Sequence, residues 1–129
     1  MNTNDAPYST GMPVWTGSEM ILAGTVGPTD SPTFGVRAYD PINDVWRPIS
    51  NVGFLSIYFG FWTGEKAMYP GNGVSNYDPR TDTWDTVASP FNIGGAAVWT
   101  GNSLLVYRSE DGLIYRYAPT KPLFFYQKP

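Results

Sequence analysis

Apolar and polar residues alternate along this chain in short runs, and glycine, proline, asparagine and aspartate bound nearly every run. Aromatic and β-branched residues gather inside the runs, which is typical of β-strands rather than helices. Four strands are expected in each of three successive units. Their ranges are 12–16, 20–23, 36–39 and 45–49, then 56–63, 67–69, 74–77 and 83–87, then 96–100, 104–107, 113–117 and 123–126. The sequence therefore predicts an all-β chain whose units span about 11–50, 54–88 and 93–127 within a single domain, 1–129.

Two motifs recur in these units at a spacing of roughly 40 residues, which indicates one supersecondary unit per repeat. The first motif is Trp-Thr-Gly, and the second is Tyr-Asp-Pro-x-x-Asp-x-Trp, which fades at the third copy. The repeated residues are Trp15, Gly17, Tyr39, Asp40, Asp44 and Trp46, then Trp62, Gly64, Tyr77, Asp78, Asp82 and Trp84, then Trp99, Gly101 and Tyr117.

A structural role explains both motifs. Tryptophans at fixed strand positions are expected to fill the gap between neighbouring sheets, because each can bury on the order of 200 Å². The Asp-Pro segment is expected to form the hairpin between the third and fourth strands, where both aspartates can accept backbone N–H groups. A calcium loop would need more closely spaced oxygen ligands and a glycine at the bend, so no metal site is expected.

Four antiparallel strands repeated at this period predict the blades of a β-propeller. Three blades do not close a ring, because propellers have about four to eight. Three explanations stay open. The chain is part of a longer protein with further blades, it forms a homodimer with six blades, or it remains an open array.

The two motifs resemble the kelch repeat, as in kelch-type propellers and the central domain of galactose oxidase. The Trp-Thr-Gly-x-Glu-Met form at residues 15–20 is similar to bacterial kelch units. The family's paired glycines are reduced to Ala23-Gly24 and absent at Tyr107-Arg108, and the third unit has Ala118 in place of the turn aspartate. The resemblance implies a propeller that presents loops to a protein or glycan partner.

Composition narrows the chemistry further. The chain has 129 residues, a net charge of −3, and neither cysteine nor histidine. These absences remove cysteine nucleophiles, the Ser-His-Asp triad, structural zinc and the histidine-held copper that a resemblance to galactose oxidase would imply. Basic residues such as Arg37 and Lys66 are scattered singly, so no nucleic-acid partner is expected. No cofactor is expected either.

The sequence shows neither a signal peptide nor a membrane-spanning stretch. The first five residues lack the basic start and apolar core of a signal peptide. The longest apolar stretch, Val52 to Trp62, is too short for the roughly 20 residues that span a bilayer, and is expected to form a buried strand pair. The compartment stays open, although the bacterial character of the repeats favours an exported or cell-surface parent protein.

The leading functional hypothesis is a non-catalytic module that binds a protein or a glycan. The least repetitive connection, Gly24 to Gly35, is the expected recognition loop. The corresponding loop of the third unit holds the densest charge cluster. The candidate ligand-binding residues are Thr29, Asp30, Arg108, Glu110 and Asp111. Solvated hairpin tips are the structural alternative for these positions.

An enzyme is the second hypothesis. The chain would be part of a galactose oxidase-like oxidase or a sugar-processing enzyme whose catalytic residues lie elsewhere. Glu110 and Asp111 are expected to point to opposite sides of a strand, and Glu19 and Glu65 recur at turn positions, so no catalytic residue is assigned. A third hypothesis is a truncated product without a function of its own.

Overall fold

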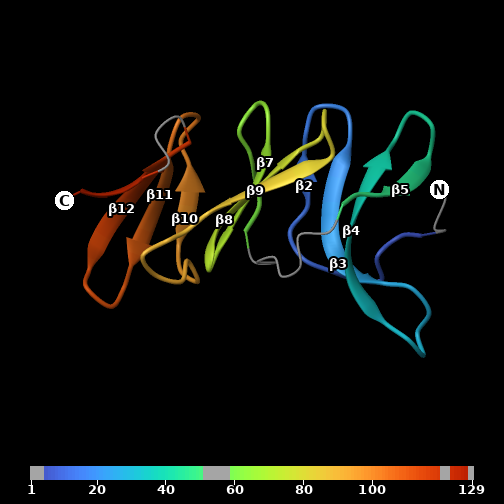
Figure 1. Ribbon diagram of the computed structural model, residues 1–129, viewed down its shortest axis with the longest axis horizontal. Helices are drawn as coiled ribbons and strands as arrows, with labels where there is room; N and C mark the ends of the chain where they lie inside the picture. The colour runs from blue at the N-terminus through green and yellow to red at the C-terminus, as the bar shows by residue number, and fades with distance from the viewer. Residues whose placement is uncertain (1–4, 51–58, 120–122, 128–129) are drawn as a thin grey trace.

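The computed structural model describes residues 5–50, 59–119 and 123–127, with residues 9–10 and 123–127 as backbone only. All regular structure in these ranges is β, and it forms three antiparallel sheets. The all-β prediction with blade-like sheets is therefore confirmed. The sheets are called blade 1, blade 2 and blade 3 in chain order, and they stand side by side in Figure 1.

Blade 1 is built on a meander of three strands, with two short strands on the free edge of the first. Its strands are β1 (Ser9–Thr10), β2 (Val14–Trp15), β3 (Met20–Val26), β4 (Thr33–Asp40) and β5 (Val45–Pro48). Both β1 and β2 pair with β3. The sequence did not predict β1, because two residues are too few to show an alternating pattern.

The predicted loop from Gly24 to Gly35 is wrong at both ends. Gly24 pairs with Gly35 and Val26 with Thr33, so the segment is the end of the β3–β4 hairpin and only residues 27–32 connect the strands. Glycine, proline and threonine mark this stretch as a loop in the sequence, but ladder hydrogen bonds to the neighbouring strand decide its structure.

Blades 2 and 3 each have four strands in simple meander order. Blade 2 comprises β6 (Phe61–Trp62), β7 (Ala67–Gly71), β8 (Gly73–Asp78) and β9 (Thr83–Val87). Blade 3 comprises β10 (Ala97–Trp99), β11 (Leu104–Arg108), β12 (Leu113–Ala118) and β13 (Leu123–Gln127). Most bounds agree with the predicted ones within about two residues. The predicted strand 56–63 and the apolar stretch 52–62 lie largely outside the described residues, and only Phe61–Trp62 is strand there.

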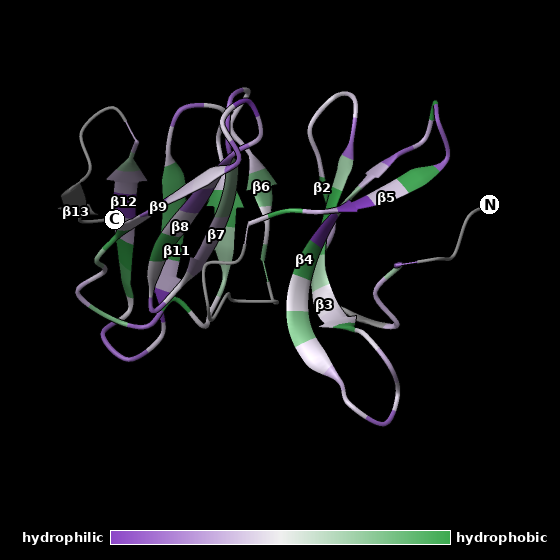
Figure 2. Ribbon diagram, turned by 45° about the vertical axis from the view of Figure 1, so that its right-hand side comes forward, coloured by the Kyte–Doolittle hydropathy of each residue, from purple (hydrophilic) through white to green (hydrophobic). Residues whose placement is uncertain are grey.

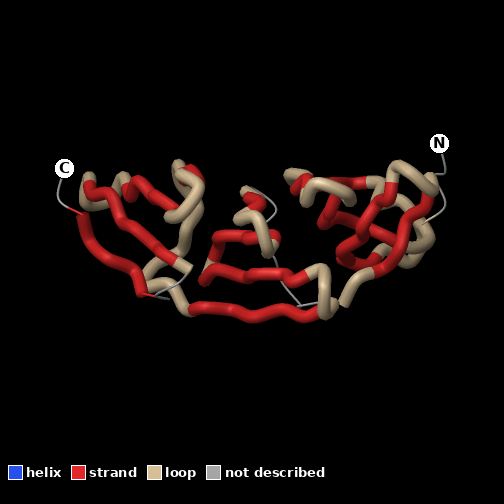
Figure 3. The backbone as a smooth tube through the Cα atoms, turned by 90° about the horizontal axis from the view of Figure 1, so that it is seen from above, coloured by secondary structure: helices blue, strands red, loops and turns tan. Residues whose placement is uncertain are grey.

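The blades fan out around one concave side, on which the first strand of each blade lies (Figure 3). One buried cluster fills the space between blades 1 and 2 and includes Val14, Ile21 and Tyr77. A second cluster fills the space between blades 2 and 3 and includes Met68, Val106 and Tyr117. Figure 2 shows the apolar strand segments that supply these clusters. This face-to-face packing is the propeller arrangement.

The Trp-Thr-Gly motif makes the same turn in every blade. The threonine hydroxyl, as in Thr16, accepts the backbone N–H three residues later at 3.0 Å in blades 1 and 2. Gly17, Gly64 and Gly101 have φ of 104°, 100° and 97°. Only glycine adopts such values without strain, which explains why it follows the threonine in all three copies.

The first aspartate of the Asp-Pro turn accepts backbone N–H groups of its own turn, as predicted. Asp40 accepts the N–H groups of Ile42 and Asn43 at 2.8 and 3.3 Å. The second aspartates, Asp44 and Asp82, have φ of 53° and 52°, in the left-handed region that aspartate tolerates. Each accepts a hydrogen bond from the tyrosine that opens its motif, at 2.7 Å for Asp44 and 2.9 Å for Asp82.

Candidate functional site

A row of four side chains crosses blade 2 and faces blade 1. In blade 2 the row is Trp62, Ala67, Tyr77 and Trp84, which are successive partners across the ladder. All four belong to or pack against the buried cluster shared with blade 1. We call this set the aromatic row of a blade, and the opposite face its forward face.

The aromatic row of blade 1 has no blade in front of it within the described residues. It consists of Trp15, Met20, Tyr39 and Trp46 in the same register. Trp15 is 52% exposed, whereas the equivalent Trp62 packs against the cluster between blades 1 and 2. In the single chain, Trp15 therefore fills no gap between described sheets, because its row faces away from blade 2.

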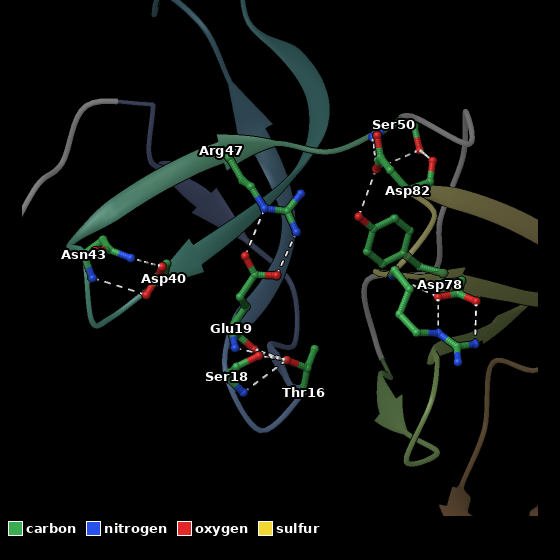
Figure 4. Close-up of polar contacts among 11 residues, drawn as sticks. Thr16, Ser18, Glu19, Asp40, Asn43, Arg47, Ser50, Asp78 and Asp82 are labelled. Atoms are coloured by element: carbon green, nitrogen blue, oxygen red, sulfur yellow. Dashed lines mark hydrogen bonds and ion pairs between the residues drawn. The ribbon is translucent and has the colours of Figure 1, made fainter.

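Polar contacts gather at the junction between blades 1 and 2, some within blade 1 and some between the two blades. Arg47 donates two hydrogen bonds to Glu19, at 2.9 and 2.7 Å. These bonds raise the pKa of Arg47, against the cost of burial, and a hydrogen bond to Tyr77 of blade 2 adds to the effect. Nearby, the Ser50 N–H donates to Asp82 at 3.0 Å. Figure 4 shows Arg47 beside Glu19, and Ser50 beside Asp82.

The equivalent ion pair of blade 2 has the opposite polarity. Lys66 and Asp85 occupy the places of Glu19 and Arg47, and the ammonium of Lys66 contacts the carboxylate of Asp85. Asn76 also donates to Asp85, at 2.9 Å. Blades 1 and 2 therefore share an ion pair at these two positions with the charges exchanged, whereas blade 3 has Ser103 and Phe125 there.

The hairpin tip of blade 1 carries two of the candidate ligand-binding residues. Thr29 and Asp30 are exposed in the connection between β3 and β4, which Ser31 closes by donating its N–H to the Pro28 carbonyl at 3.0 Å. This tip and the β11–β12 turn lie at the same end of the molecule but on blades 1 and 3 (Figure 1). Thr29 and Asp30 therefore do not share a site with the charged candidates.

The other three candidates form one cluster in blade 3. Arg108 lies 2.9 Å from a carboxylate oxygen of Asp111 and 3.7 Å from one of Glu110. The expectation that Glu110 and Asp111 point to opposite sides of a strand is wrong, because both lie in the turn after β11 and both approach Arg108. Burial acts to raise the pKa of Asp111, but the hydroxyl of Tyr115, the Leu113 N–H and Arg108 together lower it.

A cleft of about 270 Å³ lies beside this cluster. Its wall includes Phe91, Arg108 and Glu110, together with the Gly94-Gly95 pair. The Arg108 guanidinium sits 5.1 Å from the centre of the Phe91 ring, and Tyr115 packs against the same ring at 4.5 Å. Sequence reasoning missed Phe91, and no local pattern marks it, because it precedes Arg108 by a whole strand and its approach depends on the fold of blade 3.

We also searched the described part of the chain for a metal site and for a membrane-spanning helix. Among those residues, no three aspartates or glutamates gather closely enough to hold a metal ion. None of the elements built from them is a helix with the length and apolar character needed to cross a membrane.

Comparison with known proteins supports the repeat assignment. No family model matches the chain. A putative F-box/kelch-repeat protein of Arabidopsis thaliana is 31% identical over 70 residues, which is 50% of this chain and 19% of that protein. A second F-box/kelch-repeat protein of the same plant is 32% identical over 81 residues, which is 53% of this chain and 19% of that protein.

The names of these relatives and the three-blade structure both support kelch-like repeats. The sequence is similar to kelch-repeat proteins of a plant, and neither relative is named as an oxidase. The expected bacterial character and the resemblance to galactose oxidase therefore gain no support from them. The chain spans about a fifth of the length of each relative, at 19%.

Proposed function

We propose that this chain is a kelch-like module that binds a protein partner, and that the cleft beside Arg108 and Glu110 is its contact site. The observation that carries the proposal is the combination of an aromatic ring, Phe91, with an accessible charge cluster in one cleft. The similarity to two F-box/kelch-repeat proteins supports an interaction role rather than catalysis. Connections at one end of a blade are also where a rigid scaffold commonly presents its recognition residues.

The charges indicate a basic partner segment. Arg108 contributes one positive charge, and Glu110 and Asp111 one negative charge each, so the cluster carries a net charge of −1. Asp111 holds the closer contact with Arg108, and the Glu110 side chain is 70% exposed. This exposure supports the proposal that Glu110 receives a lysine or arginine of the partner.

The size of the cleft favours a protein segment over a small ligand. Its volume of about 270 Å³ lies below the roughly 300 to 1,000 Å³ of most small-molecule pockets. A side chain anchored in it, with further contacts on the surrounding surface, suits a protein interface better. A glycan partner remains the alternative within the same class of binding module.

The alternative hypothesis, an enzyme, requires that this chain belong to a longer protein. A galactose oxidase-like or sugar-processing enzyme would have to take its catalytic residues from outside this chain, which has no histidine and no cysteine. No specific observation favours it. An exported or cell-surface location likewise stays a prediction.

Selection from a random peptide library displayed on phage would test the proposal. Peptides enriched on the chain should carry a basic residue, and Glu110→Gln should weaken their binding roughly tenfold, because the charge pair is lost. Glu65→Gln is the matched control, since Glu65 is an exposed glutamate in the β6–β7 turn at the opposite end of the blades. Its binding should equal that of the unchanged chain.

Two results would contradict the proposal. One is a folded chain that enriches no peptide. The other is equal weakening by Glu110→Gln and Glu65→Gln, which would place the contact away from the cleft. A glycan array run in parallel separates the alternatives, because glycan binding without any peptide binding would support a glycan partner instead.

A further inference from the structure

The two outermost faces of the described blades are of opposite kinds. Blade 1 exposes its aromatic row, with Trp15 52% exposed. Blade 3 exposes its forward face, on which Val98 and Leu105 are direct partners across the ladder and Val98 is 54% exposed. In both described junctions an aromatic row meets a forward face. Among the described residues, one face of each kind therefore stays open.

The apolar composition of the two open faces matches that of the closed junctions. Between blades 1 and 2, the forward face supplies Val14 and Ile21, and the aromatic row supplies Trp62 and Trp84. Val98 and Leu105 occupy in blade 3 the positions of Val14 and Ile21 in blade 1, in the same pairing between first and second strands. A surface of this kind, left uncovered, is an interaction site or an aggregation hazard.

The polar groups of the closed junctions also have counterparts on the open faces. At each junction one forward-face side chain interacts with the tyrosine of the next aromatic row and shifts a pKa there: Arg47 with Tyr77, and Asn76 with Tyr117. In blade 2 that tyrosine donates to Asp82 at 2.9 Å. A cation of blade 1 thus faces a Tyr–Asp pair of blade 2.

The open faces repeat this arrangement of charge. Arg116 directly precedes the row tyrosine of blade 3, as Asn76 does in blade 2, and its side chain is exposed. Its Nε donates to Ser103 at 2.9 Å, which holds the guanidinium on the forward face. On the open row of blade 1, Tyr39 donates to Asp44 at 2.7 Å. Arg116, at the position of Asn76 rather than that of Arg47, thus gives the open forward face a cation, and the Tyr39–Asp44 pair gives the open row a Tyr–Asp pair like Tyr77–Asp82.

We propose that a second copy of this chain covers both faces, with blade 3 of each copy docked on the aromatic row of blade 1 of the other. The contact is head to tail, and such contacts close into a ring when the rotation between copies permits it. Two copies of three blades make six, within the usual range of about four to eight. The arc in Figure 3, with the first strands on its concave side, is the shape that such a half-ring needs.

Mass in solution tests the assembly directly. Light scattering after size exclusion, across a concentration series, should give twice the 14.3 kDa mass of one chain. Val98→Asp and Trp15→Lys should each weaken the dimer on the order of 100-fold, because each buries an uncompensated charge in both interfaces. Ile42→Asp is the matched control and should leave the mass unchanged, since Ile42 is 87% exposed in the β4–β5 turn and lies on neither face.

A mixture of the two variants distinguishes head-to-tail docking from a symmetric contact. The Val98→Asp chain keeps its aromatic row, and the Trp15→Lys chain keeps its forward face, so a mixture should regain dimer mass although neither variant does so alone. Circular dichroism confirms that each variant is folded, which is expected because both side chains are exposed in the single chain.

The polar contact can be tested by a double-mutant cycle with Arg116→Ala and Asp44→Asn. Asparagine tolerates the left-handed conformation at Asp44, so its fold should be kept. Each substitution should weaken the dimer roughly tenfold, and the double variant should be no weaker than either alone.

The possible contrary results are distinct. A monomer at every concentration would mean that something other than a second copy covers these faces, and would overturn the proposal. A dimer that neither Val98→Asp nor Trp15→Lys affects, or a mixture that stays monomeric, would overturn the head-to-tail contact. Mass that keeps growing with concentration would overturn the closed ring.

Discussion

Arg47 and Glu19 are held together by two parallel hydrogen bonds, from Nε to Oε1 at 2.9 Å and from Nη2 to Oε2 at 2.7 Å. Glu19 comes from the turn before β3 and Arg47 from β5, so the pair bridges two strands that lie on either side of β4. The same arginine reaches Tyr77 in blade 2. One side chain therefore ties two strands of a blade to the next blade.

Replacement of this arginine should destabilise the chain. Arg47→Ala is expected to lower the free energy of unfolding by about 1 kcal/mol, because a forked pair is lost while solvent screens a side chain that is 38% exposed. Urea unfolding followed by tryptophan fluorescence measures the change. Arg80→Ala is the control, with an expected change of about 0 to 0.5 kcal/mol, because Arg80 is 66% exposed and pairs only two residues away with Asp78. Equal effects would contradict a role of Arg47 at the junction.

Trp84 and Trp15 should respond differently to the same substitution. The indole N–H of Trp84 donates to the Ser50 carbonyl at 2.7 Å, and its ring packs between blades 1 and 2. Trp84→Phe should therefore cost about 1 to 2 kcal/mol, from a lost hydrogen bond and lost packing. Trp15→Phe should cost less than about 0.5 kcal/mol in the monomer, because Trp15 is 52% exposed. Thermal unfolding at low protein concentration compares the two, and a larger loss for Trp15→Phe would contradict the assigned packing.

Acid should weaken the fold partly through Asp82. The Ser50 N–H holds the pKa of Asp82 below its ordinary value of 3.8, with help from Tyr77. A lowered pKa in the folded state adds stability that is present above about pH 4 and is lost as the pH falls through the folded value. Asp82→Asn keeps the left-handed turn and should show a smaller loss of stability between pH 7 and pH 3. Denaturant midpoints at both pH values measure this, and an unchanged acid dependence would exclude Asp82 as a source.

Removal of the hydroxyl should affect stability differently at two tyrosines, Tyr69 and Tyr77, because their hydroxyls have different partners. Tyr69 is buried, and its hydroxyl has no hydrogen-bond partner in the described part of the chain, so Tyr69→Phe should be neutral or slightly stabilising. Tyr77→Phe should cost about 1 to 2 kcal/mol, because its hydroxyl contacts Arg47 and Asp82. Chemical denaturation at pH 7 compares the two variants. A greater loss for Tyr69→Phe would reverse the assignment.

Alkaline pH offers a second readout for Tyr77. Burial raises the pKa of Tyr77 to about 12 from the ordinary value of 10.0. The neutral hydroxyl therefore adds stability that is complete below pH 10 and falls as the pH rises toward 12. Tyr77→Phe should show a smaller decrease over this interval than the unchanged chain, and absorbance titration of the tyrosines gives an independent check.

Local chemistry made much of the fold predictable. Short runs of aromatic and β-branched residues located most strands, and the Asp-Pro and Thr-Gly motifs located the turns, because each depends on neighbours within about four residues. The β3–β4 extension was missed because turn-forming residues dominate its composition. Glu110 and Asp111 were misplaced because a strand was assumed where the chain turns.

The candidate site was less predictable than the strands. The sequence picked out Arg108, Glu110 and Asp111 by their charge density, and the structure brings these three together. Phe91 could not be predicted, since its approach to Arg108 follows from how the segment before β10 crosses blade 3. Thr29 and Asp30 fell in the same predicted site only because the two hairpin ends are equivalent in the repeat.

By itself, the sequence determined the number of units, their strand order and the turns between them, since these follow from contacts close along the chain. Only the tertiary structure decided which face of each blade is covered. Trp15 and Trp62 occupy the same motif, yet one is half exposed and the other packs between sheets. The difference comes from whether a neighbouring sheet stacks in front of the row, and that depends on packing between residues far apart in the sequence.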